Sequence, residues 1–194
     1  MRIVVADVET SGLDPWRDRL LSIGAVALEH GTVRFSDSFQ ILVRQEHASA
    51  PQNILVHGIG GTAQMNGAEA GDALAAWCRF AGTAPLVGFH ADFDRIVIDR
   101  ATRAALGTPP DHQWLDLAFL APALFSQEAA TLDDWMRVFG IEAYARHDAL
   151  ADALATAQLL QVVLAEGARR GMRTLDDYSA LERDRRWLVQ SLRR

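Results

Sequence analysis

Four acidic side chains and one histidine, carried by three short segments, are the residues of this sequence that could support metal-dependent chemistry. They are Asp7, Glu9, Asp94, His147 and Asp152. Asp7 and Glu9 end an apolar, strand-like run at residues 2–8, and side chains two apart on a strand point to the same side. Two carboxylates this close repel each other unless a cation lies between them, and such oxygen ligands suit Mg²⁺ or Mn²⁺.

Two of the other three residues, Asp94 and His147, also have a simpler explanation. Asp94 follows the segment 85–88, a short strand that ends at a glycine, and an acid near the start of a helix is favoured by the helix dipole. Asp152 lies about one turn inside an Ala/Leu-rich helix, a poor position for aspartate unless a metal requires it. His147 directly precedes that helix. A histidine there can act as a base at neutral pH, but taken alone it is more often an ordinary surface residue.

The elements that must position these residues predict an α/β fold. Strands are predicted over residues 2–8, 20–29 and 33–43, and a tight turn at residues 29–32 indicates an antiparallel meander. Short strands and helices then alternate, with strands over residues 85–88 and 114–117 and helices over residues 68–81, 92–106, 118–124, 131–139 and 148–166. This order predicts a mixed sheet with helices on its faces.

Length and composition fit one domain with a sizeable core. The 194 residues are 49% hydrophobic and have a formal net charge of −6. This charge argues against a general nucleic-acid-binding protein, but not against an enzyme whose clustered acids are neutralised by bound cations. The N-terminal apolar run is too short for a signal peptide, and no stretch is expected to be long enough to span a bilayer. A cytoplasmic protein without a membrane partner is therefore expected.

The three segments, in this order, resemble the three motifs of the DEDD exonuclease superfamily, the DnaQ-like or RNase T-like group. Asp7 and Glu9 match the first motif, Asp-x-Glu-Thr-x-Gly-Leu. Asp94 matches the aspartate of Gly-x-x-x-x-Phe-Asp in the second. His147 and Asp152 match the third, and a histidine five residues before the last acid is the spacing of the DEDDh branch.

The resemblance implies an RNase H-like exonuclease fold over residues 1–166, with the four acids meeting at one end of a mixed sheet. It also implies two divalent cations, Mg²⁺ or Mn²⁺. One ion, with His147 as general base, would generate the attacking hydroxide, and the other would stabilise the leaving 3′ oxygen. The implied reaction is 3′→5′ hydrolysis at the 3′ end of single-stranded or frayed nucleic acid, releasing nucleoside 5′-monophosphates.

Four further residues are expected to contact the substrate. They are Thr10, Leu13, His57 and Phe93. His57 lies in Val-His-Gly-Ile, which is similar to an element that helps to hold the terminal nucleotide in this family. Without the other motifs, a buried histidine at a turn would be the better explanation. The second motif departs from the family at residues 88–90, where Gly-Phe-His replaces Gly-His-Asn, and altered local hydrogen bonding is expected there. Asp116 is expected to be structural.

Residues 167–194 are expected to form a C-terminal helical appendage, with a helix over about residues 175–192 that packs on the domain or binds a partner. Arginines are frequent here, and they could follow a nucleic-acid backbone or form a solvated face. They are Arg169, Arg170, Arg173, Arg183, Arg185, Arg186, Arg193 and Arg194.

Three functions follow from the resemblance. A DNA exonuclease, free-standing or acting as a proofreading subunit of a DNA polymerase, is favoured. An RNA-trimming exonuclease of the same fold is the first alternative. A non-catalytic polymerase-associated subunit is the second, and the complete set of five catalytic positions argues against it. A homodimer is left open.

Overall fold

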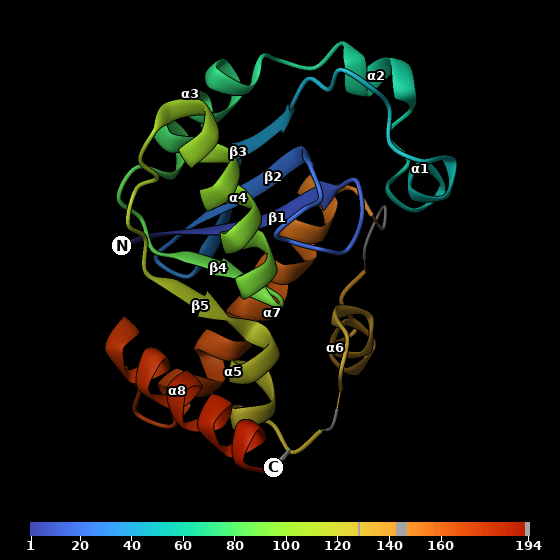
Figure 1. The fold of residues 1–194 in the computed structure, drawn as a ribbon. Coiled ribbons are helices and arrows are strands. Elements are labelled where there is room, and N and C mark those ends of the chain that lie inside the picture. Colours follow the sequence, from blue (N-terminus) through green and yellow to red (C-terminus); the bar gives the residue numbers. More distant parts are fainter. Residues whose placement is uncertain (128, 143–146, 193–194) are drawn as a thin grey trace.

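A five-stranded mixed sheet forms the centre of the computed structural model, which describes residues 1–127, 129–142 and 147–192 (Figure 1). The strand order is β3-β2-β1-β4-β5. The strands are β1 (Arg2–Thr10), β2 (Leu20–Glu29), β3 (Thr32–Leu42), β4 (Leu86–Gly88) and β5 (Trp114–Asp116). The β1–β2 and β2–β3 pairs are antiparallel, whereas β4 pairs parallel with both β1 and β5. The predicted α/β class, with its meander and added parallel strands, is therefore confirmed.

Eight helices occupy the described part of the chain. They are α1 (Pro51–His57), α2 (Gly61–Met65), α3 (Ala70–Ala81), α4 (Ala91–Leu106), α5 (Leu117–Leu124), α6 (Leu132–Phe139), α7 (Ala149–Arg169) and α8 (Leu175–Leu192). The predicted helices are present with ends shifted by a few residues. The predicted start of α6 is confirmed in detail, because Thr131 and Asp134 form a capping box. The sequence did not predict α1 and α2, which are short and surrounded by glycines.

Both faces of the sheet are covered by helices. On one side, Val5, Leu28 and Leu115 belong to an apolar cluster with residues of α5, α6 and α7. On the other side, Val4 and Ile23 pack with residues of α3 and α4. Because successive side chains of a strand point to opposite faces, β1 and β2 read as nearly continuous apolar runs.

Helix α7 is the element that contacts the centre of the sheet, lying against β1 and β2. By length and composition alone, its 21 residues would suffice to cross a membrane, so the expectation that no stretch approaches that length is wrong. Half of its apolar window is buried inside the protein, including Leu159, Leu160 and Val163. Its apolar composition is therefore that of a core helix.

Helix α8 lies against α5 and β5 (Figure 1). Tyr178 is buried, and its hydroxyl donates to the carbonyl oxygen of Leu164 at 3.2 Å. Of the C-terminal arginines, Arg193 and Arg194 lie outside the described residues.

Gly24 on β2 allows α7 to approach the sheet. A Cβ atom at this position would lie 2.1 Å from the backbone carbonyl carbon of Ala149 and the backbone nitrogen of Leu150. Such a contact cannot be relieved by turning a side chain, because the neighbouring atoms are backbone. The first turn of α7 therefore needs glycine opposite it.

We expect Gly24→Ala to lower the free energy of unfolding by about 1–3 kcal/mol or more, since α7 must shift to admit the methyl group. Chemical denaturation monitored by circular dichroism measures this change. Gly71→Ala is the matched control, because a Cβ at Gly71 in α3 would meet nothing within 4 Å. The control should be neutral or slightly stabilising. Equal stability of the Gly24 variant and the wild type would contradict the packing argument.

Candidate active site

Three of the predicted acidic residues lie together at one end of β1. Asp7 and Glu9 come from β1 and Asp152 from the first turn of α7, and one carboxylate oxygen of each lies within 4.8 Å of the others. Asp152 is buried, whereas Asp7 and Glu9 are half-buried. Three carboxylates at this separation repel one another unless a cation neutralises them. The all-oxygen donor set fits a hard divalent cation such as Mg²⁺ or Mn²⁺.

The position of Asp152 follows from the way α7 begins. Asp148 caps the helix, because its Oδ1 accepts a hydrogen bond from the backbone N–H of Ala151 at 3.0 Å. The other oxygen of Asp148 accepts from Gln40 Nε2 of β3 at 3.0 Å. With the start of the helix fixed, Asp152 one turn later faces Asp7, which is paired with Gly24 in the sheet register.

Asp94 lies beside this group of three rather than within it. Its side chain is buried in the first turn of α4, and its Oδ1 accepts a hydrogen bond from the backbone N–H of Val8 at 3.1 Å. Val8 stands between Asp7 and Glu9 in β1. Burial raises the pKa of the Asp94 carboxyl well above its usual range, the nearby charges of Asp116 and Glu9 raise it further, and backbone hydrogen bonds oppose the shift. A cation bound here would favour the ionised form.

His147 is tied to the acidic group through its backbone. Its N–H donates to Asp152 Oδ2 at 3.1 Å, and its φ of 61° is left-handed. The residue is exposed, so its ring is accessible to solvent. The structure thus places His147 next to Asp152, as the third motif requires.

The residues expected to contact the substrate lie in different environments. Leu13 is 92% exposed on the loop that follows β1, and Thr10 Oγ1 donates to the carbonyl oxygen of Gly12 at 2.6 Å in the same loop. Phe93 is partly buried against the apolar cluster beneath α4.

His57 is almost fully buried at the end of α1, and both of its ring nitrogens are engaged. Nδ1 accepts the N–H of Ile59 at 3.0 Å, and Nε2 lies 3.1 Å from Ser49 Oγ. Gln64 of α2 completes the group, because its Nε2 donates to Ser49 Oγ and to the carbonyl oxygen of Ile59. Gly58, with a φ of 68°, turns the chain between them. His57 therefore fixes the loop that follows α1, and little of its own surface can meet a ligand.

A cavity of about 400 Å³ opens beside Glu9. Its lining includes the loop of Gly58, Ile59 and Gly60 and the start of α7. The sequence did not single out two other lining residues, Ser22 and Gln40. Ser22 is paired with Glu9 across β1 and β2, and its buried hydroxyl has no hydrogen-bond partner. Ser22 is a polar residue in the otherwise apolar run of residues 20–28, which is a signal that the sequence contains, but only the register of β1 and β2 places it opposite Glu9.

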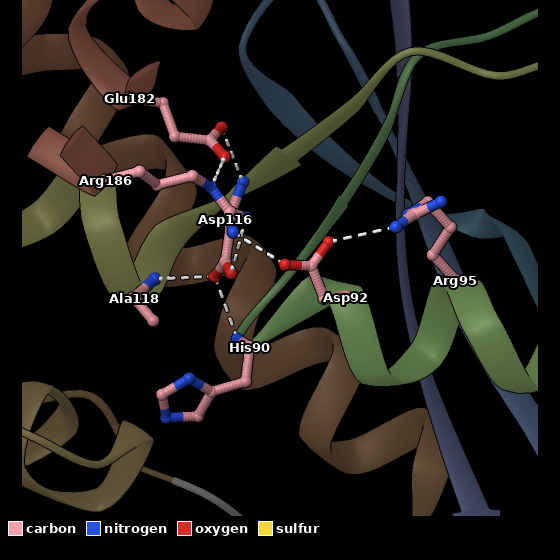
Figure 2. A network of polar contacts seen from close by, with 7 residues as sticks. All are labelled: His90, Asp92, Arg95, Asp116, Ala118, Glu182 and Arg186. Carbon is pink, nitrogen blue, oxygen red and sulfur yellow. Dashed lines mark hydrogen bonds and ion pairs between the residues drawn. The ribbon is translucent and has the colours of Figure 1, made fainter. Parts of the chain in front are cut away.

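Asp116 has the structural role that was expected of it (Figure 2). Its Oδ1 accepts hydrogen bonds from the backbone N–H groups of Ala118 and His90, both at 2.9 Å, so it caps α5 and holds the start of α4. Its Oδ2 pairs with Arg186 of α8 at 3.1 Å. Arg186 therefore does not belong to a nucleic-acid-tracking or solvated face, which were the two roles expected for the late arginines. Its guanidinium is instead surrounded by carboxylates.

Comparison with known proteins identifies the family. The sequence model of the exonuclease family RNase T matches residues 4–160. The chain belongs to this exonuclease family. A PolC-type DNA polymerase III of Thermotoga petrophila is 27% identical to this chain over 156 residues, which are 80% of this chain and 11% of that protein. The resemblance to the DnaQ-like superfamily is therefore confirmed.

Solved structures show the same fold. Escherichia coli exonuclease I in complex with a dT13 oligonucleotide has a TM-score of 0.77 and 20% identity, covering 91% of this chain and 43% of that chain. Exonuclease X in complex with 5′ overhanging duplex DNA has a TM-score of 0.72 and 20% identity, covering 93% and 99% of the two chains. The chain thus has the predicted RNase H-like fold, and it spans about a tenth of the PolC-type relative and less than half of exonuclease I.

The burial of His57 gives the stability of the protein a testable pH dependence. Desolvation lowers the pKa of His57 below its usual value of 6.5, and protonation at Nδ1 would also break the hydrogen bond from Ile59. The contribution of neutral His57 to stability is fully present above the pKa that His57 has in the unfolded chain. It is lost as the pH falls through the lower pKa that His57 has in the folded protein.

We therefore expect the melting temperature of the wild type to fall more than that of His57→Gln between about pH 7.5 and about pH 5.5. Differential scanning fluorimetry at a series of pH values measures the difference. His47→Gln, at an exposed histidine, is the control and should follow the wild type. Parallel curves for the wild type and His57→Gln would exclude the proposed contribution of His57.

Proposed function

We propose that this chain is a metal-dependent 3′→5′ exonuclease that releases nucleoside 5′-monophosphates from the 3′ end of single-stranded or frayed DNA. The observation that carries the proposal is the group of three carboxylates from β1 and α7, with His147 attached to one of them by its backbone. Membership of the exonuclease family supports the same chemistry.

We assign the binding of two Mg²⁺ or Mn²⁺ ions to Asp7, Glu9, Asp94 and Asp152. When bound, divalent cations supply positive charge opposite the reacting phosphate and lower the pKa of water. Asp7 and Glu9 on β1 and Asp152 on α7 would hold the cations between two elements that are fixed by the core. His147, exposed beside Asp152, accepts the proton of the attacking water. Asp94, buried behind β1, fixes the backbone between Asp7 and Glu9 by its bond to Val8.

The cavity beside Glu9 is the proposed site of the terminal nucleoside. Its lining offers the backbone of Gly58 and Gly60 and the side chains of Ser22 and Gln40. We assign Leu13, which is 92% exposed on the loop that follows β1, to contact with the face of a base, and Thr10 and Phe93 to further substrate contacts. His57 contributes by fixing the loop of Gly58, Ile59 and Gly60 through its hydrogen bonds.

DNA is the favoured substrate because exonuclease I and exonuclease X, which share the fold, were solved with DNA. A second candidate role is proofreading beside a DNA polymerase, which the PolC-type relative favours. RNA trimming, a homodimer and a cytoplasmic location stay predictions. A ladder of products from a 5′-labelled DNA strand, compared with matched RNA and with EDTA, tests the direction, the substrate and the need for metal.

Asp7→Asn should lower the rate of DNA degradation by more than about a hundredfold, because one ligand that neutralises the cations is lost. The fold should survive, since Asp7 is half-buried at the end of β1. Initial rates on 5′-labelled single-stranded DNA, together with a circular dichroism spectrum, measure both. Asp111→Asn, an exposed acid outside the site, is the matched control. Wild-type activity in Asp7→Asn would refute the assigned metal site.

His147→Ala should lower the rate at neutral pH by about 10²–10⁴-fold, the usual contribution of a positioned base, while Mn²⁺ still binds. The pH–rate profile of the variant should lose the limb that the histidine produces. His47→Ala, another exposed histidine, should keep the wild-type rate. An unchanged rate in His147→Ala would show that another group accepts the proton.

A further inference from the structure

Arg186 on α8 holds acidic side chains from three different elements (Figure 2). Its Nη1 lies 2.6 Å from Asp92 Oδ2 of α4, its Nη2 3.1 Å from Asp116 Oδ2 of β5, and its Nε 2.7 Å from Glu182 Oε1 of α8 itself. The side chains of Asp116 and Glu182 are 2% and 9% exposed. The guanidinium also lies over the ring of Phe119, with its carbon 4.2 Å from the ring centre. Each guanidinium nitrogen therefore has a carboxylate partner.

These contacts reach the first turn of α4 by two routes. The direct route is Asp92, a residue of that turn. The indirect route is Asp116, which pairs with Arg186 through Oδ2 and accepts the N–H of His90, the N-cap of α4, through Oδ1. Glu182 strengthens the second route because its Oε2 accepts the backbone N–H of Asp116 at 3.0 Å. Arg186 thus fixes the beginning of α4 at two points.

The same turn of α4 carries Asp94. The Oδ1 atom of Asp94 accepts the N–H of Val8, the residue between Asp7 and Glu9. Ion pairs and hydrogen bonds therefore connect α8 to the first turn of α4, and a further hydrogen bond connects that turn to the strand that carries two of the proposed metal ligands.

We propose that Arg186 is a positioning residue for the metal site: through Asp92 and Asp116 it sets where Asp94 lies relative to Asp7 and Glu9. The inference rests on the proposed function, since it assumes that these acids bind cations. Arg186 lies beyond the residues that the family model matches, 4–160. Helix α8 is then a part of the active site's support rather than a separate appendage.

The shape of the guanidinium matters as much as its charge. Arginine presents several N–H donors in a rigid planar fork, whereas the ammonium group of lysine is a single charged point on a flexible chain. Lysine at position 186 would keep the charge among the three carboxylates but could not hold all three in this geometry. A role limited to charge and a role in positioning therefore predict different results for Arg186→Lys.

The test measures Mn²⁺ binding directly, by the electron paramagnetic resonance signal of free Mn²⁺ in titrations of the full chain. We expect Arg186→Gln to weaken Mn²⁺ affinity by about tenfold or more, the usual effect of losing a residue that orients a ligand. Arg186→Lys should give a smaller loss of the same kind. The Mn²⁺ concentration for half-maximal nuclease rate should rise in parallel, while KM for the oligonucleotide stays unchanged.

Arg183→Gln is the matched control, because Arg183 is an exposed arginine on the same helix. It removes the same charge from α8 and should leave Mn²⁺ affinity at the wild-type value. Asp92→Asn is a third variant, which weakens only the direct contact between Arg186 and α4. The side chain of Asp92 is exposed, so this variant should fold. It should lose Mn²⁺ affinity by a few-fold relative to the wild type.

The outcomes separate this inference from the proposed function. The inference would be overturned, and the proposed metal site left intact, if Arg186→Gln folds and binds Mn²⁺ with wild-type affinity. If Arg186→Gln does not fold, wild-type Mn²⁺ affinity in both Arg186→Lys and Asp92→Asn would overturn it in the same way. An equal loss in Arg183→Gln would also overturn it, since the effect would then be one of net charge. If the wild type itself binds no Mn²⁺, the proposed function and the inference both fail.

Discussion

Three carboxylates can lie within 4.8 Å of one another here because the backbone of α7 approaches the backbone of β2 more closely than most side chains would allow. Gly24 makes this approach possible, and Asp7 is its partner in the adjacent strand. The repulsion between the three carboxylates is offset by the free energy gained when the apolar helix α7 packs against the buried strands β1 and β2. The geometry of the site is therefore a result of core packing, and the hydrogen bonds around it refine that geometry.

The sequence was most informative where a function depends on local spacing. The period of two in β1 placed Asp7 and Glu9 on one side, and the capping positions of Asp148, Thr131 and Asp134 could be recognised from neighbouring residues. Family resemblance then supplied the order of the motifs, which composition and periodicity could not. The mixed sheet followed from the succession of strands and helices.

What the sequence could not predict depends on residues that are distant in the chain. The hydrogen bond that Asp94 accepts from the N–H of Val8, 86 positions away, could not be predicted from the spacing of the motifs. The pairing of Arg186 with Asp116 spans 70 positions. Helices α1 and α2 escaped prediction for another reason: with seven and five residues, they are too short to show an apolar period.

Helices α1 and α2 differ from the other helices in the interactions that hold them in place. Among the residues of α1 and α2, all of which the structure describes, the buried ones are His57 and Gln64, and both are polar. Hydrogen bonds to Ser49 and Ile59, rather than apolar burial, fix the loop over the cavity. Opening this segment would expose little apolar surface, so it would take place with a small change in heat capacity and independently of the core. The loop of Gly58, Ile59 and Gly60, which lines the cavity, can thus be released by local fluctuations while the carboxylates of β1 and α7 stay in place.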